Sequence, residues 1–496
     1  MSEQQSGVSR RGFLHTTAAA GAGAAALSVA TAAADHHKEG GKSANGVLRL
    51  GYIGVGGRAQ AHISSAIDLQ KSDKTVEIAT VCDVFNRYTD KTAKKVQSKT
   101  GKAPKKTGDY RDILSDDSID AVVISTPDHW HAKQTIDALK AGKHVYCEKP
   151  MTHSVEEALA VHKAWLDSGL VMQVGVQSTS LPVWPAVNER IRGGDLGKIM
   201  QYQTEFFRNS DMGQWRYYGL SEDMNPKNVD WKMFLGTEFG LAPDMPFDRA
   251  KFAQWRCYWE FGAGMFTDLF VHRTTSMLLA TGLRFPGRVT GAGGIYLEYD
   301  GRDVPDVATV VADFDEGVQG LVTATMCSAN TPIKQTIRGH HGAVVFGVGE
   351  EFTGYDFVAE RPQVHHERGL KSERVEVGGI RNSSLVHFRN FVEAAIAGKP
   401  GDVNCSPELG AAAMTIVKLG SKSYREGKVF RFDKEEMNYR EGDGSWAAKW
   451  EERSEARGEP SHVPGWAAGD RGSKLIPRDY QALEGPWIDG VDPAKG

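Results

Sequence analysis

The chain has 496 residues, more than one ordinary hydrophobic core accommodates, so we expect two domains with additional terminal segments. It carries 59 Lys and Arg against 63 Asp and Glu, and this near balance excludes a broad basic surface of the kind that binds nucleic acid or anionic lipid. Its five cysteines are scattered and include no Cys-x-x-Cys pair, so neither a disulfide framework nor a metal site is predicted.

The N-terminus has the layout of an export signal. Ser9 to Leu14 reads Ser-Arg-Arg-Gly-Phe-Leu and precedes an Ala/Gly-rich stretch that ends in Ala32-Ala33-Ala34. This pattern is typical of a twin-arginine signal with a small-residue cleavage site, and it predicts a periplasmic or otherwise exported protein. We assign residues 1–34 to the signal and 35–46 to a polar linker; the alternative is a disordered Ala-rich tail. The stretch is too weakly apolar for a stable span, so no membrane insertion is expected after cleavage.

Short apolar strands alternate with helical stretches from Val47 onward. The strands are predicted over residues 47–53, 76–82, 121–125 and 144–147. The third of them is a nearly continuous apolar run, as expected in a parallel sheet that is covered on both faces. The alternation predicts βαβ units and therefore an α/β Rossmann domain with a doubly wound parallel sheet over residues 47–175.

The pattern changes to half-buried alternation beyond about residue 175. Extended segments are predicted over residues 199–207, 307–314, 318–326 and 336–346, the middle two as a hairpin. Helices are predicted over residues 386–397 and 407–425. These elements predict an α+β substrate and oligomerisation domain with a large, mostly antiparallel open sheet over residues 176–435. Residues 436–496 are polar and turn-rich, and we expect an extended tail there.

A glycine-rich loop directly follows the first predicted strand. Gly54-Val55-Gly56-Gly57-Arg58-Ala59 fits G-x-G-x-x-A, in which glycines allow a tight turn and close approach to a pyrophosphate at a helix N-terminus. Asp83 ends the second strand, where its carboxylate would accept hydrogen bonds from ribose hydroxyls and repel a 2′-phosphate. NAD is therefore the predicted cofactor, and Arg87 leaves NADP possible. The alternative is a glycine turn in an unrelated α/β domain. The cofactor contacts predicted here are Gly54, Gly56, Gly57, Arg58 and Asp83.

Glu148-Lys149-Pro150 lies at the carboxyl end of another predicted strand, where open α/β sheets place their ligands. Pro150 favours an extended Lys149. Beside a nicotinamide, the Lys149 ammonium could bind a substrate hydroxyl and favour its alkoxide form. On its own, such a tripeptide more often forms a surface salt bridge.

Two longer segments carry a family resemblance. Thr126 to His131 reads Thr-Pro-Asp-His-Trp-His, and Ala141 to Pro150 ends in Glu-Lys-Pro. Both closely resemble the signature of the glucose–fructose oxidoreductase and inositol dehydrogenase family (Gfo/Idh/MocA), and the resemblance extends from the glycine loop to the end of the second domain. It implies a homo-oligomer, a dimer or tetramer packed through the second-domain sheet. It also implies that Lys149 contacts both cofactor and substrate, and that further cofactor contacts come from Thr126, Pro127, His131 and Glu148.

A second constellation is Gly262-Ala263-Gly264 followed by Asp268 and His272. Asp268 and His272 are four residues apart, so on a helix they share a face and can reach one cleft. Histidine can take a hydroxyl proton near neutral pH while the carboxylate orients it or holds another hydroxyl. Without the resemblance, a helix-surface or core role is the alternative. The segment resembles the family's glycine-rich segment followed by Asp-x-x-x-His, in which the histidine is the acid/base.

Three positions depart from the family pattern. Thr275 stands where polyol dehydrogenases often place an acidic residue, which weighs against inositol specificity. Ala263 replaces the middle glycine of the glycine-rich segment, a mild change. Asp83 differs from what an NADP-holding glucose–fructose oxidoreductase would prefer. Tryptophans also precede the Asp-x-x-x-His segment, among them Trp215 and Trp255, but core packing explains each as well as sugar binding does, so none is assigned.

The sequence thus predicts reversible hydride transfer between a secondary alcohol of a sugar or polyol and C4 of nicotinamide. His272 would exchange the hydroxyl proton, Lys149 would stabilise negative charge on the oxygen, and Asp268 would orient. Free NAD is scarce outside the cytoplasm, so a retained cofactor that a second substrate recycles is one form of this hypothesis. Two alternatives stay open: a glycosidase that uses bound NAD for transient oxidation and elimination, as in some exported relatives, and a non-catalytic sugar-binding relative.

Overall fold

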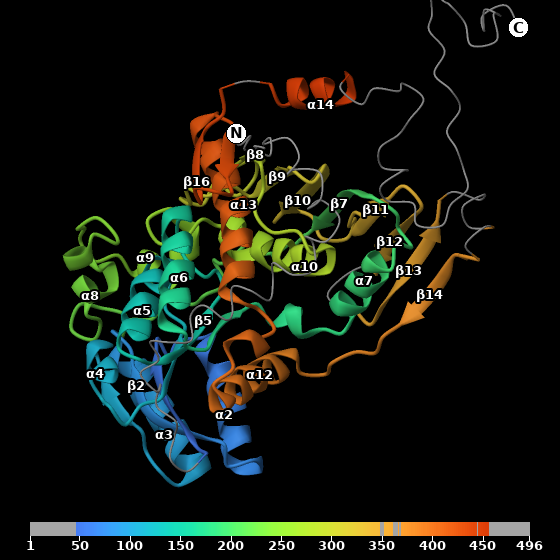
Figure 1. Cartoon of the computed structure of the whole chain (residues 1–496). Coiled ribbons are helices and arrows are strands. Elements are labelled where there is room, and N and C mark those ends of the chain that lie inside the picture. Colours follow the sequence, from blue (N-terminus) through green and yellow to red (C-terminus); the bar gives the residue numbers. More distant parts are fainter. Residues whose placement is uncertain (1–45, 348–351, 361–365, 367–368, 444, 456–496) are drawn as a thin grey trace, which may run out of the picture.

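The structure, a computed structural model, describes residues 46–347, 352–360, 366, 369–443 and 445–455 (Figure 1). The predicted signal and nearly all of the predicted linker lie outside the described residues, as does most of the predicted tail. Two sheets organise the described part of the chain. Within this part, no helix is both long and apolar enough to cross a membrane.

The first sheet is parallel throughout and has the strand order β3-β2-β1-β4-β5-β6. Its strands are β1 (Leu48–Ile53), β2 (Val76–Cys82), β3 (Lys105–Thr107), β4 (Ala121–Ile124), β5 (His144–Glu148) and β6 (Met172–Gly175). The order reverses between β1 and β4, the point at which doubly wound sheets bind ligands. The predicted Rossmann sheet is therefore confirmed.

Helices cover both faces of this sheet. Successive residues of β4 alternate between two apolar clusters, with Val122 and Ile124 facing one and Ala121 and Val123 the other, which explains its continuous apolar sequence. The helices of this region are α2 (Ala59–Ser72), α3 (Asn86–Thr100), α4 (Arg111–Leu114), α5 (Asp128–Lys140) and α6 (Val155–Ser168).

Helix α12 (Ser383–Ala397) also packs on the Rossmann sheet, beside α2 (Figure 1). Phe388 and Phe391 lie against the Tyr146 ring of β5, with ring centroids 5.5 and 5.6 Å apart. The assignment of the whole of residues 176–435 to the second domain is therefore wrong for this helix. Its apolar face was evident from the sequence, but sequence periodicity does not say which sheet such a face covers.

The second sheet has ten strands in the order β14-β13-β12-β11-β7-β10-β9-β8-β15-β16, and only the β7–β10 pair is parallel among its pairings. The predicted antiparallel sheet is confirmed, including the hairpin in which Phe314 pairs with Val318. Its strands are β7 (Ile199–Glu205), β8 (Arg288–Gly294), β9 (Val307–Phe314), β10 (Val318–Thr325), β11 (Thr336–Gly339), β12 (Gly342–Phe346), β13 (Gly354–Ala359), β14 (Glu373–Glu376), β15 (Phe430–Asp433) and β16 (Asn438–Glu441). The helices packed on it are α7 (Val183–Arg192), α10 (Val271–Thr281) and α13 (Pro407–Glu426).

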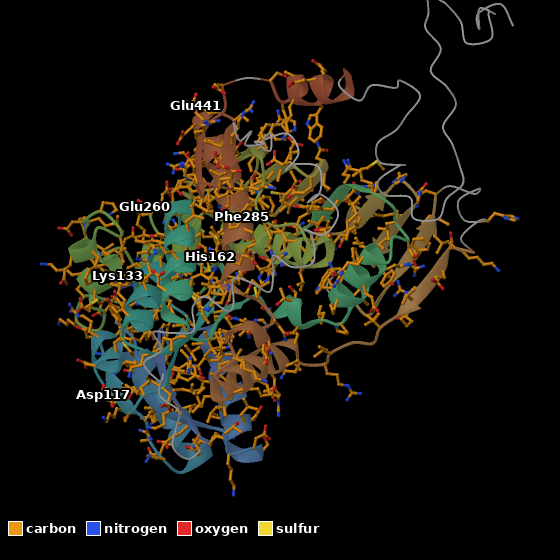
Figure 2. The ribbon with its side chains drawn as sticks, in the orientation of Figure 1. Asp117, Lys133, His162, Glu260, Phe285 and Glu441 are labelled. Atoms are coloured by element: carbon orange, nitrogen blue, oxygen red, sulfur yellow. The ribbon has the colours of Figure 1, made fainter. Side chains whose placement is uncertain are left out.

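The sheet continues past the predicted start of the tail at residue 436. Phe432 of β15 stacks on Phe285, with ring centroids 5.1 Å apart, and β15 pairs with β16, which carries Glu441 at the sheet edge (Figure 2). Helix α14 (Trp446–Glu455) follows. The tail boundary at residue 436 is therefore wrong. Strand β16 is short and polar, so it lacks the alternation by which half-buried strands are recognised.

A long connection between β7 and α10, residues 206–265, lies over the carboxyl ends of the Rossmann strands. We call it the connecting segment. It contains the short helices α8 (Trp231–Leu235) and α9 (Arg249–Ala253), drawn in green beside α5 in Figure 1. Both His129 and Trp130 of α5 place a ring nitrogen 2.8 Å from the backbone carbonyl of Phe234. These contacts join the connecting segment to the first domain.

Candidate active site

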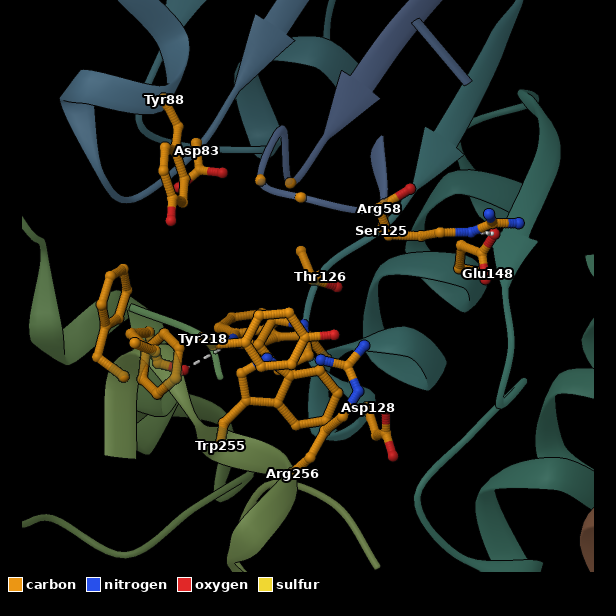
Figure 3. A pocket seen from close by; sticks show the side chains of 18 of the residues that line it. Arg58, Asp83, Tyr88, Ser125, Thr126, Asp128, Glu148, Tyr218, Trp255 and Arg256 are labelled. Atoms are coloured by element: carbon orange, nitrogen blue, oxygen red, sulfur yellow. Dashed lines mark hydrogen bonds and ion pairs between the residues drawn. The ribbon is translucent and has the colours of Figure 1, made fainter. Parts of the chain in front are cut away.

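A cavity of about 610 Å³ is lined by both the Rossmann domain and the second domain (Figure 3). Every predicted site residue except His131 lines it. The cavity therefore brings the glycine loop together with Lys149, Asp268 and His272, although more than a hundred residues separate Lys149 from Asp268.

The glycine loop turns sharply from β1 into α2. Gly54 has φ +79°, and a Cβ atom there would lie 2.8 Å from the backbone carbonyl carbon of Ser125, so only glycine fits. At Gly57 no atom of the described residues lies within 4 Å of the Cβ position, so the loop surface faces open space. This cradle leaves the backbone accessible for close approach of a pyrophosphate.

Asp83 marks the end of the cavity beside β2. Its carboxylate accepts hydrogen bonds from the backbone N–H groups of Val55 (2.8 Å) and Phe85 (2.9 Å), while burial raises its pKa to about 6. Arg87 does not line the cavity and pairs with Asp223 at 3.4 Å. A carboxylate with no guanidinium beside it fits the ribose diol of NAD better than a 2′-phosphate.

Ser125 gives independent evidence on whether a polar ligand fits this cavity. Ser125 lines the cavity, and its buried hydroxyl has no hydrogen-bond partner among the described residues. Buried polar atoms are normally paired, so an unpaired hydroxyl in a residue of the cavity wall indicates a polar ligand there. Together with the glycine cradle and Asp83, it fits a dinucleotide.

Glu148 is buried at the opposite end of the cavity from Asp83. Arg58 Nε lies 2.7 Å from its carboxylate (Figure 3), and His62 Nε2 lies 2.6 Å from it. Burial alone would raise the pKa of Glu148, but Arg58 and His62 hold this pKa well below its usual value. Arg58 thus supports the wall through Glu148, and His62 is a partner that the sequence did not reveal.

Lys149 and Asp268 form an ion pair in the cavity wall. Lys149 Nζ donates to Asp268 Oδ1 at 2.6 Å and to the Asp268 backbone carbonyl at 3.0 Å. Arg256 Nε donates to the same carboxylate at 3.0 Å, and Trp215 Nε1 donates to Oδ2 at 2.8 Å. Burial would raise the pKa of Asp268, but Lys149 and Arg256 hold it well below its usual value, so this carboxyl stays ionised.

His272 lies in the first turn of α10. Burial and the nearby Lys149 ammonium lower the pKa of His272 well below 6.5, so the imidazole is neutral at pH 7 and can accept a proton. Asp268 precedes it in a π-helical turn, Phe266–Phe270, rather than in the regular helix that the sequence predicted. Such turns are frequent at functional sites, and both side chains still line the cavity.

His131 is placed differently from the expectation that it lies along the cofactor. Thr126 and Pro127 line the cavity, but His131 is buried behind the wall. Its two ring nitrogens lie 2.5 Å from the carbonyl of Pro150 and 2.8 Å from that of Thr126. It therefore links two wall segments through their backbone, because Thr126 follows β4 and Pro150 follows β5.

Several residues of the connecting segment and its surroundings were not predicted as site residues. The Arg256 guanidinium lies over the rings of Trp255 (4.1 Å) and Tyr218 (5.5 Å), and all three line the cavity (Figure 3). Trp215 is buried with φ +66°, a conformation that is rare for a bulky residue and often marks a functional site. Asp128 also lines the cavity, and burial raises its pKa to about 7 against the opposing effect of Arg256.

Two family models match the chain. Residues 48–176 match "Oxidoreductase family, NAD-binding Rossmann fold", and residues 239–345 match "GFO/IDH/MocA C-terminal domain". Both domains belong to the Gfo/Idh/MocA family. The first is an NAD-binding Rossmann domain, which agrees with the glycine cradle and Asp83.

Two curated relatives carry glycosidase names. A glycosyl hydrolase family 109 protein of Shewanella baltica is 36% identical over 169 residues, which cover 31% of this chain and 36% of that protein. An alpha-N-acetylgalactosaminidase of Shewanella oneidensis is 34% identical over 235 residues, which cover 42% of this chain and 50% of that protein. The chain thus spans half or less of the length of these relatives.

Solved structures share the whole two-domain fold. Levoglucosan dehydrogenase in complex with NADH superimposes with a TM-score of 0.57 at 20% identity, covering 77% of this chain and 98% of that one. WlbA dehydrogenase from Bordetella pertussis, in complex with NADH and UDP-GlcNAcA, gives 0.58 at 19%, covering 78% and 98%. At this level of identity, the likeness shows the fold alone.

Proposed function

We propose that the protein is an NAD-dependent oxidoreductase that transfers a hydride between a secondary alcohol of a sugar or polyol and the nicotinamide. The observation that carries this proposal is one cavity lined by the glycine loop, Asp83, Lys149, Asp268 and His272. Bound NAD supplies the hydride acceptor. The chain supplies a base, a fixed cation and the walls that orient the alcohol.

His272 is the base that takes the hydroxyl proton, because its lowered pKa keeps it neutral. Lys149 donates a hydrogen bond to the same oxygen and stabilises the negative charge that develops there. Asp268 holds the Lys149 ammonium at 2.6 Å and stays ionised, so it orients the cation and does not carry the proton.

The rings of Tyr218 and Trp255 support a carbohydrate substrate, because aromatic faces pack well on the apolar faces of sugars. Thr275 is fully buried, and its hydroxyl donates to the Val271 carbonyl at 2.5 Å. The position that carries an acidic residue in polyol dehydrogenases therefore contributes no group to this cavity, which supports a substrate other than inositol.

A second candidate is a glycosidase that oxidises its substrate transiently, eliminates the aglycone and restores NAD. The glycosidase names of the curated relatives favour it. Asp128 also favours it, because elimination needs a further proton transfer and this buried carboxyl, whose pKa is about 7, lines the same cavity.

A panel of sugars, polyols and aryl glycosides separates these functions. Accumulation of NADH with a free sugar supports the oxidoreductase, and aglycone release at constant NAD supports the glycosidase. His272→Ala should strongly reduce either activity. Sugar binding without turnover of any compound would contradict both and leave the non-catalytic relative.

Export and self-association complete the proposal. The Arg10-Arg11 pair and the Ala32-Ala33-Ala34 site support delivery by the twin-arginine pathway. Replacing both arginines by lysine should keep the protein in the cytoplasmic fraction, whereas export of that variant would contradict this route.

Light scattering of the purified protein measures whether it is a dimer or tetramer; a monomer would contradict the homo-oligomer.

A further inference from the structure

One wall of the cavity next to Asp83 comes from the second domain. The side chains that the connecting segment contributes there are apolar, and three of them, Met224, Phe234 and Phe252, are buried. The residues of this wall that line the cavity are Met224, Met233, Phe234, Phe252 and Ala253. The Rossmann domain contributes Asp83 and Tyr88 opposite them.

Backbone contacts tie this wall to the loop that follows Asp83. The Asp230 N–H donates to the Val84 carbonyl at 2.9 Å, and the Asn86 N–H donates to the Asn228 carbonyl at 3.1 Å. Phe85 and Val229 form an antiparallel bridge between these two bonds. The wall therefore begins within two residues of the carboxylate that fits the adenosine ribose.

Side chains reinforce these contacts across the domain boundary. The rings of Phe85 and Phe252 meet edge to face with centroids 5.7 Å apart, and both belong to one buried apolar cluster. On the α5 side, the Lys133 ammonium (labelled in Figure 2) lies 4.7 Å from the centre of the Phe239 ring. The wall is thus held from two sides of the cavity.

We infer that residues 224–253 of the connecting segment form the second wall of the adenosine subsite and control how fast NAD leaves. Asp83 takes the ribose at the end of β2, so the base beyond it faces this wall. An adenine ring buries its apolar faces against methionine and phenylalanine side chains. Departure of the adenosine requires this wall to move, and the contacts to Val84, Asn86 and Phe85 oppose that movement.

The inference deepens the proposed function, because it concerns the cofactor site on which that function rests. Its test needs no substrate, so its outcome is independent of which reaction the protein catalyses. The test measures exchange on the holoprotein: protein loaded with isotope-labelled NAD is mixed with excess unlabelled NAD, and the release of label is followed with time.

Met224→Ala removes a side chain of the wall, and we expect release of label about tenfold faster than in the wild type. Arg249→Ala acts from outside, because Arg249 Nε donates to the Met224 carbonyl at 2.9 Å, and we expect release about threefold faster. Met212→Ala is the matched control. Met212 belongs to the connecting segment but is exposed, lies outside residues 224–253 and does not line the cavity, so release from this variant should stay at the wild-type rate.

Faster release from both Met224→Ala and Arg249→Ala, with Met212→Ala unchanged, supports the inference. Wild-type rates in Met224→Ala and Arg249→Ala would overturn it, and so would equal acceleration in all three variants. Arg249→Ala decides alone if Met224→Ala does not fold. Wild-type protein that bound no labelled NAD would overturn the inference together with the cofactor assignment.

Discussion

The two ends of the cavity hold carboxylates in opposite environments. Asp83, at the adenosine end, accepts hydrogen bonds only from backbone N–H groups within the described part of the chain, and burial raises its pKa to about 6. Glu148 and Asp268, at the reacting end, are held by cations that keep their pKa values well below the usual range despite burial. A carboxylate without a cation has lone pairs left for a ligand, whereas a carboxylate already paired serves to orient its partners. Buried carboxylates thus bind the ligand at one end of the cavity and orient neighbouring side chains at the other.

The largest effect should follow from breaking the reacting end. Lys149→Met or His272→Ala should lower kcat about a thousandfold, because each removes a group that touches the reacting oxygen. The NAD content of the purified His272→Ala protein should stay at the wild-type level. Turnover is measured with the substrate that the panel identifies. His162→Ala, a histidine on α6 outside the cavity, is the control, and unchanged kcat in His272→Ala would refute the assigned base.

Breaking the adenosine end should instead weaken cofactor binding. Gly54→Ala places a Cβ atom against the Ser125 backbone at positive φ, so we expect the Kd for NAD to rise about a hundredfold and the free energy of unfolding to fall by about 2 kcal/mol. Gly57→Ala meets no atom within 4 Å, and its free energy of unfolding should match the wild type. Titration calorimetry and denaturant unfolding measure both quantities; equal stability of the two variants would contradict the steric argument.

The hydrogen bond from Trp215 to Asp268 at the reacting end can be tested by substitution. Trp215→Phe removes the N–H that donates to Asp268 Oδ2 but leaves Lys149 and Arg256 in place. We expect kcat to fall about tenfold with little change in KM, because one hydrogen bond to a charged group is lost. Trp184→Phe is the control. Trp184 is as fully buried as Trp215, but its indole N–H donates to the Ser178 carbonyl, away from the cavity. An equal loss of kcat in both variants would indicate general destabilisation.

The smallest effect concerns the pH dependence of NAD binding. Asp83 takes up a proton as the pH falls through about 6, and a protonated carboxyl cannot accept both ribose hydrogen bonds. The Kd for NAD should therefore rise as the pH falls below about 6, by up to about tenfold per pH unit. Asp83→Asn should bind NAD weakly with no such dependence, and Asp73→Asn, outside the cavity, should follow the wild type. A flat profile in the wild type would contradict the role of Asp83.

The sequence revealed the parts of the site that local chemistry dictates. The turn at Gly54, the acid after β2 and the lysine after β5 each follow from a few neighbouring residues and the element that carries them. The sequence did not reveal the partners of the buried carboxylates. His62 contacts Glu148, and Trp215 and Arg256 contact Asp268, only because the tertiary fold brings them together. The same limit applies to α12, whose apolar face did not specify its sheet, and to β16, whose polar residues gave no alternation.

An experimental structure of the protein with NAD bound tests the central claim most directly. The account predicts that the adenosine ribose lies at Asp83, beside the wall formed by residues 224–253. It predicts the pyrophosphate on the loop from Gly54 to Gly57 and the nicotinamide beside Lys149 and His272. NAD bound in another place, or in this cavity with its nicotinamide away from Lys149 and His272, would contradict the account.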